Sequence, residues 1–124
     1  MHRHKSSGNM LLDIFIPIEV PSGSVYRKKR DFIKEFSLVK KSRRHVTFLK
    51  DLVVIVKFFF EKNCHSDIDN MQKTLFDALT RSKYIIDDKI VKKVTAEIKE
   101  NVGIGGVSLR VYQYNTMDVF NDYF

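Results

Sequence analysis

Residues 64–99 read CHSDIDNMQKTLFDALTRSKYIIDDKIVKKVTAEIK and change periodicity part-way. Asp69 is the expected N-cap of a helix that runs from about Asn70 to Ser82, with Gln72 reaching back to the cap as in a capping box. The apolar face of this helix recurs at helical spacing and consists of Met71, Leu75, Ala78 and Leu79. Apolar and polar residues then alternate over Val91–Lys99, which predicts a strand.

Three further segments have the pattern of strands. Leu52–Phe60 is rich in β-branched and aromatic residues, which predicts a central strand covered on both faces. Alternation over Leu12–Val20 predicts a half-buried strand, in which Pro17 indicates an edge position or a bulge. Alternation over Val107–Gln113 predicts a last strand, with Gly103–Gly106 forming a hairpin turn before it.

A basic segment lies between the first two strands. Residues 26–42 predict a helix with Phe32, Phe36 and Val39 on its apolar side. The order is therefore β-α-β-α-β-β, which is typical of a small α/β domain with a mixed β-sheet and helices packed on one face. We place this single domain at residues 11–124 and interpret residues 1–10 as a disordered tail or the remnant of a purification tag. The aromatic residues 115–124 either pack on a partner subunit or fray.

The composition argues against several classes of protein. A single cysteine rules out an intrachain disulfide framework. No apolar run reaches the roughly 18 residues that a membrane-spanning helix needs. The start of the chain also lacks the apolar run that a signal peptide would need. We therefore expect no membrane partner.

Positive charge is concentrated in one part of the chain. The net charge is +7, and residues 26–50 alone hold ten Lys or Arg residues against Asp31 and Glu35. Such polarity suits a polyanion held at one surface while chemistry occurs at another, although a solvated basic helix has the same pattern. The candidates for contacts with nucleic-acid phosphates are Arg27, Lys28, Lys29, Arg30, Lys40, Lys41, Arg43 and Arg44.

Polar residues gather around the start of the second helix. Asp67 and Asp69 follow a strand and lie two residues apart, and in extended backbone such residues project to one side. Two carboxylates on one side repel each other unless a cation or proton lies between them. Asn70, Lys73 and Asp77 share one helix face and adjoin the two aspartates.

A second acidic pair, Asp87 and Asp88, follows the helix. Carboxylate oxygens suit Mg²⁺ or Mn²⁺ better than Zn²⁺. Such ions polarise a phosphodiester and activate water, while Lys73 is placed to neutralise charge on a phosphate. A helix cap, a surface aspartate and an Asp–Asp turn would give the same residues. A zinc site from Cys64, His65 and His45 would have too few ligands.

The complete spacing is D-x-D-N-x-x-K-x-x-x-D-A-L, followed after seven residues by D-D. Over residues 66–88 this resembles the signature of the RusA-type Holliday junction resolvases. The resemblance implies a homodimeric, Mg²⁺- or Mn²⁺-dependent endodeoxyribonuclease of the small α/β class. Such an enzyme resolves four-way DNA junctions by paired symmetric nicks in recombination and repair, in the cytoplasm of a bacterium or encoded by a prophage.

The resemblance also implies roles for individual residues. It assigns Asp67, Asp69 and Asp88 to the acidic centre that holds the metal, and Lys73 to the essential lysine. The positions that match the pattern in supporting roles are Asn70, Asp77 and Asp87.

Two other functions remain as alternatives. A non-catalytic nucleic-acid-binding module would use the acidic centre only as structure, and the intact set of three aspartates and Lys73 argues against it. A small metal-dependent phosphohydrolase acting on a mononucleotide or a sugar nucleotide needs no broad basic surface, so the basic segment argues against that function.

Overall fold

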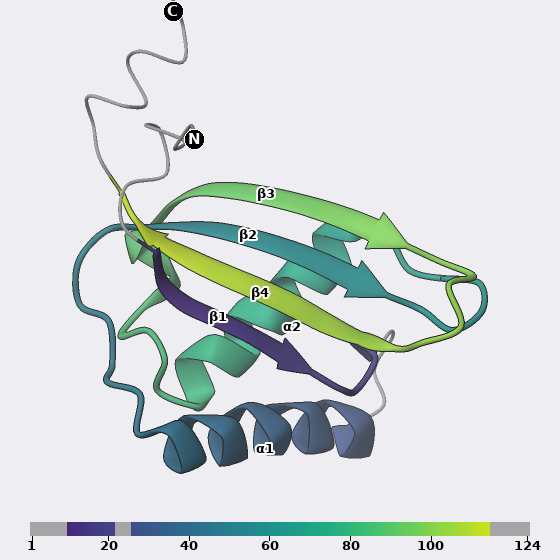
Figure 1. Cartoon of the computed structure of the whole chain (residues 1–124), viewed down its shortest axis with the longest axis horizontal. Coiled ribbons are helices and arrows are strands. Elements are labelled where there is room, and N and C mark those ends of the chain that lie inside the picture. The colour runs from purple at the N-terminus through teal and green to yellow at the C-terminus, as the bar shows by residue number, and fades with distance from the viewer. Residues whose placement is uncertain (1–9, 22–25, 115–124) are drawn as a thin grey trace, which may run out of the picture.

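The computed structural model describes residues 10–21 and 26–114 (Figure 1). The elements confirm the predicted order: they are β1 (Met10–Ile16), α1 (Tyr26–Arg43), β2 (Leu52–Phe59), α2 (Ile68–Arg81), the short 3-10 helix η2 (Asp88–Ile90), β3 (Val91–Lys99) and β4 (Gly106–Gln113). The expectations for residues 1–9 and 115–124 lie outside the described residues.

The four strands form one mixed sheet in the order β1-β4-β2-β3. β3 is parallel to β2, whereas β4 is antiparallel to both of its neighbours, β1 and β2. Both helices lie on the same face of this sheet (Figure 1). The predicted small α/β domain with helices on one face is therefore confirmed.

The prediction that a hairpin joins the last two strands, β3 and β4, is wrong. β4 is inserted between β1 and β2, so the link from β3 to β4 has to cross the end of β2 (Figure 1). The link is held there by backbone hydrogen bonds: the N–H groups of Asn101 and Val102 donate to the carbonyl oxygens of Lys62 and Phe60, at 2.9 and 3.2 Å. Gly103 has a φ of 78°, which a glycine adopts without strain.

β2 is central, as predicted, but it is covered on only one face. Val54, Val56 and Phe58 point toward the helices and are at most 1 % exposed. On the other face Val53 is buried, Ile55 and Phe59 are half-buried and Lys57 is exposed, and neither helix of the described residues packs there. A run of apolar residues in sequence does not distinguish one covered face from two, since three of the four residues on the second face, Val53, Ile55 and Phe59, are also apolar.

β1 is shorter than predicted and ends at Ile16, because Pro17 cannot donate a hydrogen bond to the sheet. The edge position that Pro17 indicated is confirmed, since β1 pairs with β4 alone. The strand begins at Met10, one residue inside the segment that we interpreted as a tail.

The structure confirms the helix predicted over residues 26–42 and its apolar side. Phe32 and Phe36 are fully buried, and their rings meet edge to face with centroids 5.1 Å apart. Tyr84 packs against Phe36 in the same geometry at 6.0 Å, and burial raises the pKa of the Tyr84 hydroxyl to about 12. No helix among the described residues is long and apolar enough to cross a membrane.

Candidate active site

The acidic stretch opens α2, but the residue that caps the helix is Asp67 and not Asp69. Asp67 has extended backbone, with φ −85° and ψ 165°, and its Oδ1 accepts a hydrogen bond from the Asn70 N–H at 2.9 Å. The helix therefore starts at Ile68, two residues earlier than expected. Its end at Arg81 lies within a residue of the expected end.

This shift changes the relation between the two aspartates. Asp69 lies in the first turn of α2 and not in extended backbone, so the expectation that it projects beside Asp67 as on a strand is wrong. Both carboxylates are exposed. At the start of a helix, a carboxylate is stabilised by the unpaired N–H groups and the helix dipole, typically by about 0.3–1 kcal/mol. That stabilisation offsets part of the repulsion between them.

α2 has the two faces that its sequence predicts. Met71, Leu75 and Leu79 are buried against the sheet, while Lys73 and Asp77 are exposed on the opposite side. Since the apolar face is fixed by packing, the polar face is held in a fixed orientation relative to the rest of the domain.

Lys73 and Asp77 differ in what they contact. Asp77 Oδ1 accepts a hydrogen bond from Arg81 Nε at 3.0 Å, one helical turn further on. Lys73 makes no hydrogen bond or salt bridge with the described part of the chain. The ammonium group of Lys73 is therefore available to an added anion.

The segment after α2 turns back along the helix and closes a hollow against it. This acidic hollow has a volume of about 440 Å³ and is lined by Lys73, Phe76, Asp77, Thr80, Asp87 and Asp88. The structure thus brings together residues that lie up to 15 positions apart in sequence. Of the four residues predicted to be catalytic, Lys73 and Asp88 meet here, together with the supporting residues Asp77 and Asp87.

Local hydrogen bonds fix the acidic pair at the edge of the hollow. Asp87 has extended backbone and caps η2, with its Oδ1 accepting from the Lys89 N–H at 2.8 Å. This hydrogen bond and a second one with the Asp88 carboxyl group lower the pKa of Asp87, with a smaller contribution from the charge of Lys89. Asp88 lies at the wall of the hollow with its side chain exposed.

The three predicted metal ligands lie in two groups. Asp67 and Asp69 flank the start of α2, whereas Asp88 lies in the acidic hollow further along that helix. Within residues 10–21 and 26–114, no three Asp, Glu, His or Cys side chains lie close enough to one another to hold a metal ion. This finding also covers the zinc ligands considered above, Cys64, His65 and His45, all of which lie among the described residues.

Residues 26–112, which run from the start of α1 nearly to the end of β4, match the family model described as Endodeoxyribonuclease RusA. The chain belongs to the RusA endodeoxyribonuclease family. The comparison with curated proteins gave no match.

The RusA match contains the whole acidic stretch, the acidic hollow and the basic helix α1. It begins after β1, so the edge strand and residues 17–21 lie outside it. The endodeoxyribonuclease activity of the family requires a phosphodiester to be held beside catalytic groups. In this chain the matched region supplies both a cation, Lys73, and carboxylates.

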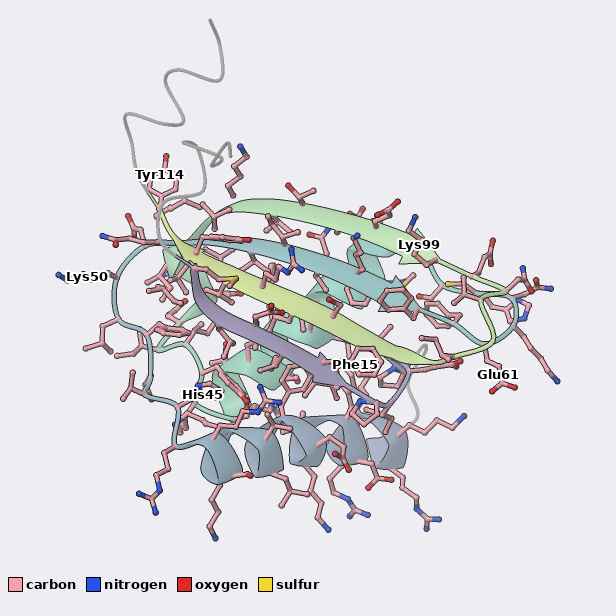
Figure 2. All side chains as sticks on the ribbon, in the orientation of Figure 1. Phe15, His45, Lys50, Glu61, Lys99 and Tyr114 are labelled. Atoms are coloured by element: carbon pink, nitrogen blue, oxygen red, sulfur yellow. The ribbon has the colours of Figure 1, made fainter. Side chains whose placement is uncertain are left out.

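The predicted DNA-binding residues of this RusA-family chain lie on and just after α1. Nitrogen-tipped side chains project from the outer side of this helix, away from the sheet (Figure 2). Lys29 and Lys40 are half-buried, and the remaining candidates are exposed: Arg27, Lys28, Arg30, Lys41, Arg43 and Arg44. α1 packs against α2, so its basic surface and the acidic residues of α2 belong to adjoining helices.

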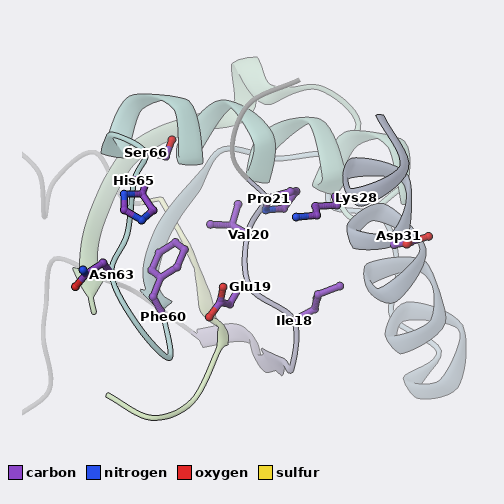
Figure 3. A pocket seen from close by; sticks show the side chains of 10 residues that line it. All are labelled: Ile18, Glu19, Val20, Pro21, Lys28, Asp31, Phe60, Asn63, His65 and Ser66. Atoms are coloured by element: carbon purple, nitrogen blue, oxygen red, sulfur yellow. The ribbon is translucent and has the colours of Figure 1, made fainter. Parts of the chain in front are cut away.

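A second pocket, of about 480 Å³, is lined in part by His65 and Ser66, which directly precede Asp67 (Figure 3). Its walls are the segment that follows β1, the first turns of α1 and the loop that leads to Asp67; they include Glu19, Lys28, Phe60 and His65. Glu19 Oε2 accepts from the Glu61 N–H at 2.9 Å and ties two of these walls together. The sequence analysis missed this pocket, and only the proximity of His65 to Asp67 could have indicated it.

Proposed function

We propose that the chain is a divalent-metal-dependent endonuclease that resolves four-way DNA junctions by paired symmetric nicks, acting as a homodimer. The observation that carries the proposal is the acidic hollow, which lies within the region that matches the RusA family. Lys73, which has no partner among residues 10–21 and 26–114, lines this hollow together with Asp87 and Asp88. A hollow of this kind on an exposed helix face is open to a phosphate of a DNA backbone.

In the proposed mechanism Lys73 binds a non-bridging oxygen of the scissile phosphate and stabilises the negative charge that grows there in the transition state. Asp77 has a positioning role at most, because its carboxylate is already paired with Arg81. Asn70 supports the centre through its backbone, which donates to the Asp67 cap.

The donor chemistry of the site fits Mg²⁺ or Mn²⁺. The proposed ligands are the carboxylates of Asp67, Asp69 and Asp88, which are exposed and of the type that these ions prefer. Like charges repel, so three carboxylates without a cation separate, and they approach one another when a cation balances their charge. When bound, the ion would polarise the phosphodiester and supply a nucleophilic water.

Two-fold symmetry accounts for paired nicks. A homodimer presents the same site twice, and a four-way junction offers two equivalent strands related by a two-fold axis. One site on each strand would then give two nicks at corresponding positions.

The proposal is tested by cleavage of a synthetic four-way junction in Mg²⁺, in Mn²⁺ or in EDTA. We expect paired, symmetric nicks in either metal and none in EDTA, because the carboxylates alone cannot activate water. Restoring Mg²⁺ to the EDTA sample is the control and should restore cleavage. Junction binding without nicks in any metal would instead identify a non-catalytic nucleic-acid-binding module.

We expect the basic face of α1 to contact DNA phosphates, which gives a separate prediction about the salt dependence of DNA binding. The double variant Arg27→Gln/Arg30→Gln should reduce the slope of log affinity against log salt by up to about 1.8, since each lost phosphate contact on duplex DNA contributes about 0.9. The matched control is Lys57→Gln, which removes an exposed cation from the sheet face that lacks helices. An equal change in slope for Lys57→Gln would move the DNA-binding surface away from α1.

A further inference from the structure

The chain reverses its direction at the end of α2, and Tyr84 is the residue at which the return segment begins. Lys83 adopts left-handed backbone with φ 67°, and its N–H donates to the Thr80 carbonyl oxygen at 3.2 Å. The Tyr84 N–H donates to the Leu79 carbonyl oxygen at 2.9 Å. These two hydrogen bonds form a Schellman motif, which closes the helix and directs the residues that follow. Asp87 follows Tyr84 by three positions, so this motif leads directly into the wall of the acidic hollow.

The ring of Tyr84 packs against α1 and the residues that follow it. Tyr84 is fully buried, and its ring meets the Phe36 ring edge to face, with centroids 6.0 Å apart. The His45 ring, just beyond α1, lies tilted against the Tyr84 ring at 5.8 Å. The His45 N–H donates to the Lys40 carbonyl oxygen at 3.1 Å, which holds His45 at the end of the helix. Edge-to-face contact is favourable because the positive edge of one ring meets the negative face of the other. The Tyr84 ring is therefore fixed relative to α1.

Backbone hydrogen bonds connect Tyr84 to the acidic pair. The Phe48 N–H donates to the Tyr84 carbonyl oxygen at 2.8 Å, and the Ile86 N–H donates to the Phe48 carbonyl oxygen at 3.2 Å. Asp87 follows Ile86 directly, and its carboxylate accepts from the Lys89 N–H at 2.8 Å. The short segment from Tyr84 to the acidic pair is thus bonded at both of its ends. A displacement of Tyr84 is therefore passed on to the wall of the acidic hollow.

Packing of the Tyr84 ring, more than backbone pairing, sets where this segment lies relative to the helices. Phe48 and Ile85 form an isolated β-bridge, whereas β2 is paired along its length with β3 and β4. An isolated bridge holds two segments to each other but does not hold them to the helices, and the buried ring of Tyr84 supplies that second constraint. The Tyr84 hydroxyl is buried and has no hydrogen-bond partner among residues 10–21 and 26–114. The ring, and not the hydroxyl, therefore makes the contacts that fix the segment.

We propose that Tyr84 is a positioning residue that holds Asp88 where it can share a divalent metal ion with Asp67 and Asp69, an inference that rests on the proposed function. Tyr84 is fully buried, so it touches neither the ion nor DNA and acts only through the wall of the acidic hollow. Mg²⁺ requires near-ideal ligand geometry, so a small displacement of Asp88 weakens metal binding. The same displacement slows the reaction, because a misplacement of about 1 Å can cost about 10²-fold in rate.

The test compares Tyr84→Leu with the matched control Phe58→Leu. Phe58 is also fully buried, but it lies in β2 between two strands that are hydrogen-bonded to it. Mn²⁺ binding is measured by calorimetry without DNA, and junction cleavage is measured under single-turnover conditions, both below the melting temperature of each variant. Tyr84→Leu should weaken Mn²⁺ binding about tenfold and slow cleavage about 10- to 100-fold, while its affinity for a junction in EDTA stays unchanged. Phe58→Leu should retain the wild-type value of each quantity.

The conservative variant Tyr84→Phe should keep wild-type Mn²⁺ binding and cleavage, because it retains the ring and removes only a hydroxyl that has no partner in the described part of the chain. A loss of either property in Tyr84→Phe would overturn the proposal, since the hydroxyl would then be needed. Equal changes in Tyr84→Leu and Phe58→Leu would also overturn it, because any cavity in the core would then have the same effect. If Tyr84→Leu does not fold, Tyr84→Met takes its place, since it leaves a flexible side chain in the same space.

The wild-type protein separates this proposal from the function on which it rests. A wild type that cleaves a junction only with metal, beside a Tyr84→Leu variant that behaves like Phe58→Leu, would overturn the role of Tyr84 alone. A wild type that neither binds Mn²⁺ nor cleaves a junction would overturn the proposed function itself.

Discussion

The Asp67→Asn variant should have the same free energy of unfolding as wild type. It should cleave a DNA junction about 10³-fold more slowly. Asparagine caps helices as well as aspartate does, so its side-chain oxygen can still accept the Asn70 N–H that Asp67 accepts at 2.9 Å. The neutral amide cannot supply the charge that a divalent cation requires, and metal-assisted charge stabilisation contributes several kcal/mol. Single-turnover cleavage and thermal denaturation measure the two quantities separately.

The Asp67→Ala variant separates the cap from the charge. It lacks both, so it should lose the same cleavage activity and also about 0.5–2 kcal/mol of stability. If Asp67→Asn cleaves as fast as wild type while Asp67→Ala is destabilised, the role of Asp67 is that of a helix cap alone. The acidic centre would then contain only Asp69 and Asp88.

The Lys73→Ala variant should bind a junction with nearly unchanged affinity and cleave it roughly 10²–10³-fold more slowly, the effect expected when one preorganised transition-state donor is removed. The structure supports this separation because Lys73 lines the acidic hollow and has no partner among the described residues. Its loss leaves no buried charge behind, so stability should not change. Cleavage rates are measured under single-turnover conditions at saturating enzyme, and junction affinities are measured by gel shift.

Arg81→Ala is the matched control for Lys73→Ala. It removes a cation from the same helix, two turns further on, and breaks the exposed pair with Asp77. Such i,i+4 pairs contribute about 0.3–0.5 kcal/mol, so both stability and cleavage should change little. A loss of rate as large as that of Lys73→Ala would show that the site needs positive charge in general and not Lys73 in particular.

The two predictions depend on the same helix but on different consequences of folding. Asp67 acts at the point where α2 begins, and the fit of its side chain to the Asn70 N–H is a local property of about four residues. Lys73 acts through a hollow whose opposite wall, Asp87 and Asp88, comes from a later segment. A change in the packing of α2 would therefore affect Lys73 more than Asp67.

Local sequence was sufficient for most of the secondary structure. Phe32 and Phe36, and likewise Met71 and Leu75, repeat at helical spacing, and burial of these residues is what the spacing predicts. The N-cap was misassigned because Asp67 and Asp69 are equally good caps by residue type. Only the backbone geometry, extended at Asp67 and helical at Asp69, distinguishes them.

The candidate site was predictable as a set of residues but not as an arrangement. The spacing of Asp67, Asp69, Lys73 and Asp88 identified the family, and the match to the RusA family confirms that inference. The expected side-by-side projection of Asp67 and Asp69 assumed extended backbone and was wrong. The second pocket gave no sequence signal, because its walls come from three segments that only the tertiary structure brings together.

The sequence by itself determined the elements, their order and the family, since each depends on residue types at short separations. Tertiary structure alone decided that β4 lies between β1 and β2, and that Asp87 and Asp88 meet Lys73. The physical reason is that alternation specifies a strand and its faces but not its partner. Strand pairing and the closing of a hollow follow from how buried faces from distant segments fit together.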